Sequence, residues 1–206
     1  MPFKETYPSA LLSEAVEAIS SLPGVGRRSA LRLALHLLKQ PSENVHHFTS
    51  AIDNLRDNVC YCRRCHMVSD EELCSICADH TRDQNLICVV ASVRDVMSIE
   101  ATGQFHGVYH VLGGIISPIA GVGPSDLTIR ELVDRTQALE PGSEIILALS
   151  GDVEGETTAF YIYRQIEHTG VKVTSLARGL GFGDDLEYAD SLTLGRSITN
   201  RQVFQP

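Results

Sequence analysis

Four cysteines stand in two C-x2-C pairs, Cys62 with Cys65 and Cys74 with Cys77, with eight residues between the pairs. Each pair can place two thiolates on one metal ion, and two pairs complete a tetrahedral set. Five of the chain's cysteines cluster within residues 60–77, which in a reducing compartment favours metal binding over disulfides. The spacing therefore predicts one structural Zn²⁺ per chain, with no open position for catalysis.

Two other uses of these thiols stay open, a pair of disulfides and an iron–sulfur cluster. The additional Cys60 could replace the ligand two residues on, whereas Cys88 is expected to be a small buried hydrophobe. Four thiolates around one dication give the site a net negative charge, which we expect Arg63 and Arg64 to offset. His66 directly follows a ligand, and we expect its ring to be exposed.

A second candidate site is the stretch LPGVGRRSA, residues 22–30, in which two glycines precede two arginines. Gly24 and Gly26 permit unusual backbone angles and leave no Cβ to block a ligand. The chain then enters a predicted helix, whose first N–H groups lack internal partners and carry partial positive charge. This combination suits a phosphate. The stretch resembles the helix-hairpin-helix motif of DNA-binding proteins, which holds DNA phosphates. The DNA-binding residues predicted from this resemblance are Gly24, Gly26, Arg27, Arg28, Arg32 and Lys39.

The helix after the glycine turn has a cationic and an apolar side. At about 100° per residue, one face holds Arg28, Arg32, His36 and Lys39. The opposite face holds Leu31, Ala34, Leu35 and Leu38. The alternative is a helical hairpin whose basic face is merely solvated.

The composition is that of a globular protein, with 43% hydrophobic and 21% charged residues over 206 positions. The formal net charge of −9 argues against a polybasic nucleic-acid binder, so any DNA contact has to be local. No apolar run is long enough for a membrane span, and the N-terminus shows no secretory pattern. We therefore expect a cytoplasmic protein.

The pattern of apolar residues predicts an α/β protein. Helical spacing is expected over residues 11–20 and 27–39 and again from Val45 to Val59. Four apolar, β-rich runs follow, NLICVVA, HGVYHVLGG, SEIILAL and VKVTSLA. Helices are expected between them at 95–100, after a capping box of Thr128 and Glu131, and at 157–168. Such alternation indicates a mostly parallel sheet with flanking helices.

Four regions result from this reading of the chain. They are a helical head at 1–55, a four-cysteine finger at 56–80, a sheet domain at 81–177 and a C-terminal segment at 178–206. The last segment is glycine-rich and then helical after Asp190, and it is short for a core of its own. We expect it to pack on the sheet domain or on another subunit.

The order of these features resembles the RecR recombination mediator family over essentially the whole chain. The resemblance rests on the glycine hairpin, the four cysteines, YHVLGG with SPIAGVGPSDL, and the closing RGL with DLEYAD. It implies a helix-hairpin-helix head, a four-cysteine zinc finger and a Toprim sheet domain. Its basic hairpin contacts correspond to Arg28 and Arg32 here, and its zinc ligands to the four cysteines.

The resemblance also implies a role without catalysis. The family forms a ring, commonly of four subunits, that clamps DNA with the helical heads lining the hole. Its partners are RecO and RecF, and together they load RecA onto gapped DNA coated by single-strand-binding protein. The implied location is the bacterial cytoplasm, at the nucleoid.

One departure bears on chemistry. Catalytic Toprim domains carry a Glu after the first strand and an Asp-x-Asp after a later one, for acid–base work and magnesium. Here these positions are Ala91 and Asp152-Val153-Glu154. A Toprim-type magnesium-dependent nuclease or topoisomerase is thus a disfavoured alternative. A nucleotide-binding regulator, suggested by GGIISPIAGVGPSD, lacks the G-x-x-x-x-G-K-[ST] pattern.

The acidic run Asp152, Glu154 and Glu156 has two interpretations. With no chemistry to perform, these side chains could dock a basic surface on RecO. Alternatively they cap the helix expected near Thr157, because acidic groups are favourable at a helix N-terminus.

Overall fold

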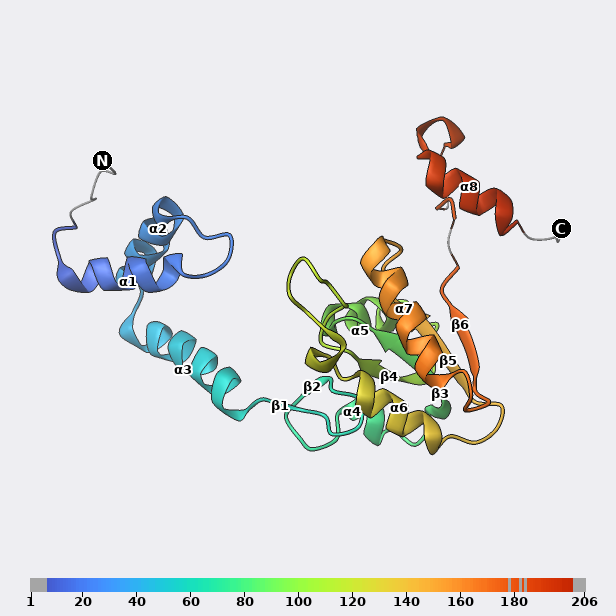
Figure 1. The fold of residues 1–206 in the computed structure, drawn as a ribbon. Coiled ribbons are helices and arrows are strands. Elements are labelled where there is room, and N and C mark those ends of the chain that lie inside the picture. Colours follow the sequence, from blue (N-terminus) through green and yellow to red (C-terminus); the bar gives the residue numbers. More distant parts are fainter. Residues whose placement is uncertain (1–6, 178, 182, 184, 202–206) are drawn as a thin grey trace. The chain divides into compact units, whose positions relative to one another are not determined.

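The computed structural model describes residues 7–177, 179–181, 183 and 185–201, and the predicted C-terminal segment 178–206 lies partly outside them. The chain divides into two compact units, Met1–Asn58 and Val59–Pro206 (Figure 1). The second unit holds both the cysteine cluster and the sheet. The predicted fold class is confirmed: a helical region, a four-cysteine cluster and a parallel sheet with flanking helices.

Within its described residues, 7–58, the first unit forms three helices, α1 (Ala10–Ser20), α2 (Arg27–Leu38) and α3 (Ser42–Asn58). The hydroxyl of Ser9 caps α1 by accepting a hydrogen bond from the Leu12 amide. α1 and α2 pack through Val16, Ala30 and Ala34. Alanines at this contact allow two helices to approach closely, but they bury little apolar area.

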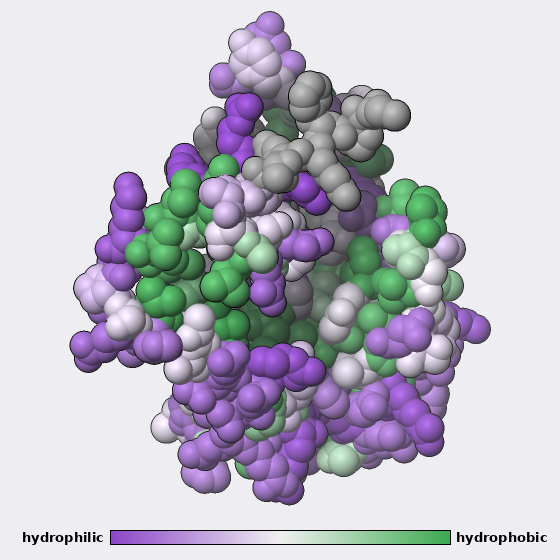
Figure 2. Space-filling view, turned by 90° about the vertical axis from the view of Figure 1, so that its left-hand side faces the viewer, coloured by the Kyte–Doolittle hydropathy of each residue, from purple (hydrophilic) through white to green (hydrophobic). Residues whose placement is uncertain are grey.

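α3 differs from its neighbours, because none of its residues, all of which are described, is buried. Its apolar stripe is as predicted, yet Phe48, Ile52 and Leu55 are about half or more exposed. Other exposed apolar side chains include Leu11, Ile119 and Val153, and Figure 2 shows green areas on the surface of the face that it draws. The helix therefore owes little of its stability to packing within the described chain.

Short elements not expected from the sequence frame the cysteines. They are the antiparallel strands β1 (Cys60–Tyr61) and β2 (Val68–Ser69) and the one-turn helix α4 (Ser75–Ala78). Two-residue strands give no periodicity for a sequence pattern to reveal.

The sheet has four parallel strands in the order β4-β3-β5-β6. They are β3 (Asp83–Val90), β4 (Gly107–Val111), β5 (Glu144–Ala148) and β6 (Lys172–Ser175). The helices that connect them are α5 (Val93–Glu100), α6 (Ile129–Gln137) and α7 (Val153–Ile166), with a 3-10 turn at Pro124–Asp126 before α6. Ile87, Leu132, Ile145 and Ile162 are fully buried members of the main core, which α6 and α7 share with the sheet.

Two predicted helix starts need correction. Thr128 does precede α6 but makes no capping box, because its hydroxyl donates to the Val111 carbonyl and lies 3.0 Å from the His110 ring nitrogen Nε2. α7 begins at Val153 and not near Thr157, because the Asp152 carboxylate accepts the Gly155 amide at 2.7 Å and caps the helix earlier.

The C-terminal part forms a 3-10 turn at Leu186–Tyr188 and the helix α8 (Ser191–Thr199). α8 starts where predicted, with the Asp190 carboxylate accepting the amides of Leu192 and Thr193. No helix in the part of the chain that the structure describes is long and apolar enough to cross a membrane.

Candidate metal centre and nucleic-acid interface

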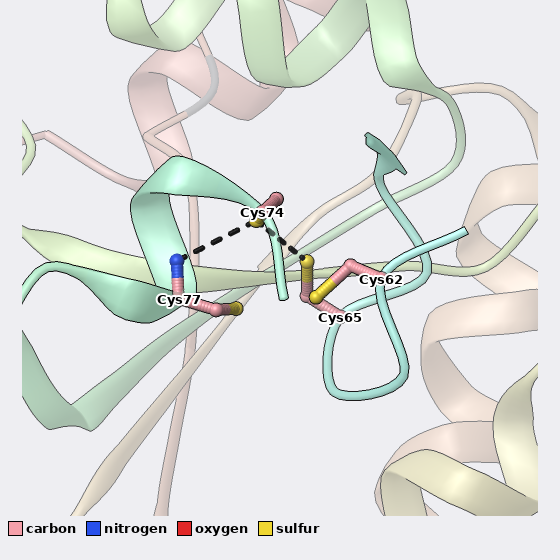
Figure 3. A group of neighbouring side chains, drawn as sticks. All are labelled: Cys62, Cys65, Cys74 and Cys77. Carbon is pink, nitrogen blue, oxygen red and sulfur yellow. Dashed lines mark hydrogen bonds between the residues drawn. The ribbon is translucent and has the colours of Figure 1, made fainter. Parts of the chain in front are cut away.

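The sulfur atoms of Cys62, Cys65, Cys74 and Cys77 converge on one point (Figure 3). All four lie within 4.8 Å of one another and all four residues are buried. Tetrahedral zinc at about 2.3 Å from each thiolate needs sulfurs about 3.8 Å apart, so the cluster fits one ion. The iron and sulfide atoms of a multi-iron cluster would have to stand between the sulfurs, for which the group is too tight. The predicted structural zinc site is confirmed.

Local backbone geometry explains how the first pair forms its loop. The Cys62 amide donates to the Met67 carbonyl at 2.8 Å, and the His66 amide donates to the Cys62 carbonyl at 2.9 Å. Closing this loop places His66 at φ 60°, the left-handed region that few non-glycine residues adopt. The second pair uses a helix start instead, since Cys74 caps α4 and its sulfur lies 3.5 Å from the Cys77 amide nitrogen.

Hydrogen bonding within the cluster separates the acidities of two thiols. The neighbouring thiol of Cys77, together with burial, raises the pKa of Cys65, and the neighbouring thiol of Cys65 lowers the pKa of Cys77 to about 6. Zinc binds thiolates, so loading the site releases the protons that remain on the four sulfurs.

The other two cysteines lie outside the cluster. The single S–H of Cys60 is shared between the carbonyls of Ser69 and Glu71, whose oxygens lie 3.1 Å and 3.2 Å from its sulfur. Cys88 is a buried core residue, as expected, and burial raises the pKa of its thiol to about 12. Such a thiol is inert at neutral pH.

The charges around the sulfurs differ from those predicted. Arg63 pairs with Glu72 at 2.6 Å, and Arg64 donates to the Gln84 side chain at 2.9 Å. The cation that lowers the pKa of Cys77 is Arg135, which lies much further along the chain on α6. No local sequence signal marks Arg135, because only the fold brings α6 to the cysteines.

His66 is also placed differently from the prediction. Its ring is half-buried and lies edge-on to the ring of His110, with 5.2 Å between ring centres. His110 is fully buried on β4, and burial lowers its pKa to about 3, so this imidazole is neutral in the folded protein.

The glycine turn has the geometry expected of an anion site. Gly24 adopts φ +81°, which glycine favours, and Gly26 precedes α2 as a cap that has no side chain to occupy the helix amides. No Asp or Glu stands between Glu17 and Glu43 in the sequence. The N-terminus of α2 thus presents amide hydrogens in a stretch without any competing carboxylate.

Of the predicted basic residues, Arg28, Arg32 and Lys39 share one surface, whereas Arg27 does not line it. Arg27, Arg28, Arg32 and Lys39 are all exposed. A groove of about 440 Å³ runs along the helix and is lined by Arg28, Leu31, Arg32, Leu35, His36 and Lys39. The predicted separation of faces is incomplete, since Leu35 lines this groove and Leu38 is 76% exposed.

Known protein families match each of the four regions predicted from the sequence. Family models match in chain order: the RecR helix-hairpin-helix at residues 12–56, the RecR four-cysteine zinc finger domain at 59–79, the Toprim domain at 85–177, and the RecR C-terminal region at 179–202. The chain is 56% identical over 200 residues to Recombination protein RecR of Porphyromonas gingivalis, covering 97% of this chain and 96% of that protein. The chain belongs to the RecR family.

Further RecR proteins show a similar relation. Recombination protein RecR of Bacteroides thetaiotaomicron is 55% identical over 201 residues, which cover 97% of both chains. That of Flavobacterium johnsoniae is 51% identical over 199 residues, 97% of this chain and 96% of the relative. The similarity to RecR proteins therefore extends over the head, the finger and the sheet domain together.

Within the Toprim domain of this RecR chain, the position after the first strand carries no acid. Ala91 directly follows β3 and packs against the main core. The acids predicted as a partner surface lie on or beside the first turn of α7, and each has a partner within the chain. Asp152 caps the helix, Glu154 accepts the Ser117 hydroxyl at 2.6 Å, and Glu156 lies 3.5 Å from Arg196 on α8.

Proposed function

We propose that this chain is a non-catalytic DNA-binding recombination mediator. It assembles into a ring-like clamp of four subunits. The clamp works with RecO and RecF to load RecA on gapped DNA coated by single-strand-binding protein. Its place is the cytoplasm, at the nucleoid. The observation that supports DNA binding is the acid-free basic face of α2 at the end of the glycine turn.

A ring explains how an acidic chain can hold DNA. Closure brings several copies of Arg28, Arg32 and Lys39 into one opening, while the excess of carboxylates elsewhere in the chain repels DNA from other surfaces. Contacts from a glycine turn and a helix N-terminus go to phosphates, so this binding reads no sequence.

The experiment is light scattering on protein of assayed zinc content, with and without DNA. We expect a mass near four chains with one zinc ion each, and a further increase when DNA is added. A zinc-loaded monomer whose mass is unchanged by DNA would contradict the clamp.

The absence of catalysis is proposed on the chemistry of the Toprim domain. Ala91 has no group to exchange a proton, and Asp152 is engaged as a helix cap. Magnesium-dependent DNA nicking that is abolished by Asp152→Ala would instead establish the nuclease or topoisomerase alternative.

The acidic run on α7 remains our proposal for the RecO contact. Glu154 is the variant we choose, because it neither caps the helix, as Asp152 does, nor faces a cation, as Glu156 does; its carboxylate accepts the Ser117 hydroxyl. We expect Glu154→Lys, with its fold checked by circular dichroism, to weaken RecO binding. Unchanged binding by a folded variant would assign these acids to capping and intrachain pairing alone.

A further inference from the structure

The zinc finger is attached to the sheet through the edge strand β4. The Val111 amide of β4 donates to the Cys65 carbonyl at 2.8 Å, so a metal-ligating residue occupies the place of a further strand. Met67 and Ile76 from the finger pack against the smaller core cluster of the sheet, which includes Cys88 and Val90. The finger and β4 thus form one packed unit.

Arg135 lies where the finger, β4 and α6 meet. Its Nη1 donates to the Tyr109 carbonyl of β4 at 2.8 Å and to the Arg64 carbonyl of the finger at 3.4 Å. One guanidinium therefore bonds the backbone of the sheet edge and the backbone between two zinc ligands. Burial lowers the pKa of Arg135, while the charges of Cys77, Cys65 and Cys62 act in the opposite direction. The side chain stays protonated, because an arginine does not lose its proton in a protein.

The neighbouring arginines do not duplicate this position. Arg63 is exposed and paired with Glu72, and screening by water makes such a pair contribute little. Arg64 donates to the side chain of Gln84 on β3 and to the Cys77 carbonyl, so it also links the finger to the sheet, but from the finger's side. Of these three, only Arg135 comes from the sheet domain.

We propose that Arg135 is a positioning residue of the zinc centre, which fixes the finger against β4 and offsets the charge of the zinc thiolates. Groups behind the ligands of a metal site orient those ligands and tune affinity, and their removal commonly costs about 10–100-fold in metal binding. A positive charge held in a partly buried place acts more strongly on thiolates than an exposed one. The fold thereby couples zinc binding to the docking of the finger on the sheet.

The test measures zinc affinity by competition with a chromophoric chelator for the full-length wild type and Arg135→Gln. We expect the variant to bind zinc about 10–100-fold more weakly. Arg130→Gln is the matched control, because Arg130 is an exposed arginine on the same helix, and its zinc affinity should equal that of the wild type. Equal affinity of Arg135→Gln and the wild type would overturn the proposal.

A second measurement separates positioning from charge alone. Hydrogen exchange of the zinc-loaded proteins reports the Val111 amide, which is protected by its bond to Cys65. We expect faster exchange at Val111 in Arg135→Gln and unchanged exchange in Arg130→Gln. Weaker zinc binding with unchanged Val111 exchange would overturn the positioning role.

Arg135→Lys keeps the proposal testable if Arg135→Gln does not fold. Lysine retains the charge but cannot present the planar guanidinium to two carbonyls. We therefore expect a folded protein with zinc affinity between those of the wild type and Arg135→Gln, and faster Val111 exchange. A lysine variant identical to the wild type in both measurements would contradict the proposal.

Discussion

The two compact units of the chain are stabilised in very different ways. Among the described residues, the sheet unit has a main core of thirteen buried apolar residues and a second cluster on β3, β4 and α5. The helical unit has three buried residues in its described core, two of them alanines, and α3 contributes none. The sheet unit therefore holds itself together, whereas the helical unit leaves apolar faces for other contacts to cover.

The same difference separates their functional sites. The four cysteines are buried in a framework of backbone hydrogen bonds, and Arg135 ties this framework to β4. The basic face of α2 is exposed along its whole length. A structural metal centre needs a buried, hydrogen-bonded environment, whereas a surface that binds DNA phosphates needs to be exposed.

The largest expected effect is from Cys74→Ser. Structural zinc contributes about 10–16 kcal/mol of apparent binding free energy in isolated zinc fingers, so losing one of four ligands should unfold the finger. We expect zinc content and melting temperature both to fall. Cys60→Ser is the control, because Cys60 lies outside the cluster, and it should retain its zinc. A Cys74→Ser protein with wild-type stability and DNA binding would refute the claim that the zinc centre stabilises the fold.

A pair of apolar-to-alanine variants, one in the core and one on α3, tests the contrast between the units. Leu132→Ala removes a fully buried side chain from the sheet core and should reduce the free energy of unfolding by about 2–5 kcal/mol. Ile52→Ala removes a side chain that is 50% exposed on α3, and should change it by less than about 0.5 kcal/mol in dilute protein. Denaturant titration of both variants measures the two changes. Similar losses of unfolding free energy would contradict the contrast between the two units.

The smallest expected effect concerns the first turn of α7. Asp152→Ala removes the helix cap and should cost about 1 kcal/mol, whereas Asp152→Asn keeps an oxygen for the Gly155 amide and should cost less. Thermal melts of the two variants measure the difference. If asparagine and alanine prove equally destabilising, the carboxylate has a role other than capping.

The sequence predicted what depends on spacing. The cysteine pairs predicted the zinc ligands, the apolar periodicity predicted α1 to α3, and alternation predicted a parallel sheet, all of which the structure confirms. Residue spacing does not predict the partner of a side chain where contacts between distant parts of the chain determine it. Thr128 looks like a helix cap, but β4 supplies it with the Val111 carbonyl as a partner.

The remaining differences have the same physical origin. Arg135 reaches the backbone of the finger at Arg64 only after α6 has packed beside β4, and His66 lies against His110 only once the finger has docked on the sheet. The exposure of Leu38 was not predicted, because an amphipathic pattern shows which face is apolar but not whether anything covers it.

The measurement that tests the central claim most directly is the salt dependence of duplex DNA binding by the wild type and by Arg28→Ala with Arg32→Ala. Each lost phosphate contact should reduce the slope of log affinity against log salt by about 0.9. Arg56→Ala is the control, an exposed arginine of α3 outside the groove, and should leave the slope unchanged. We predict a clearly flatter slope for the double variant. A slope identical to that of the wild type would show that the basic face of α2 does not hold DNA.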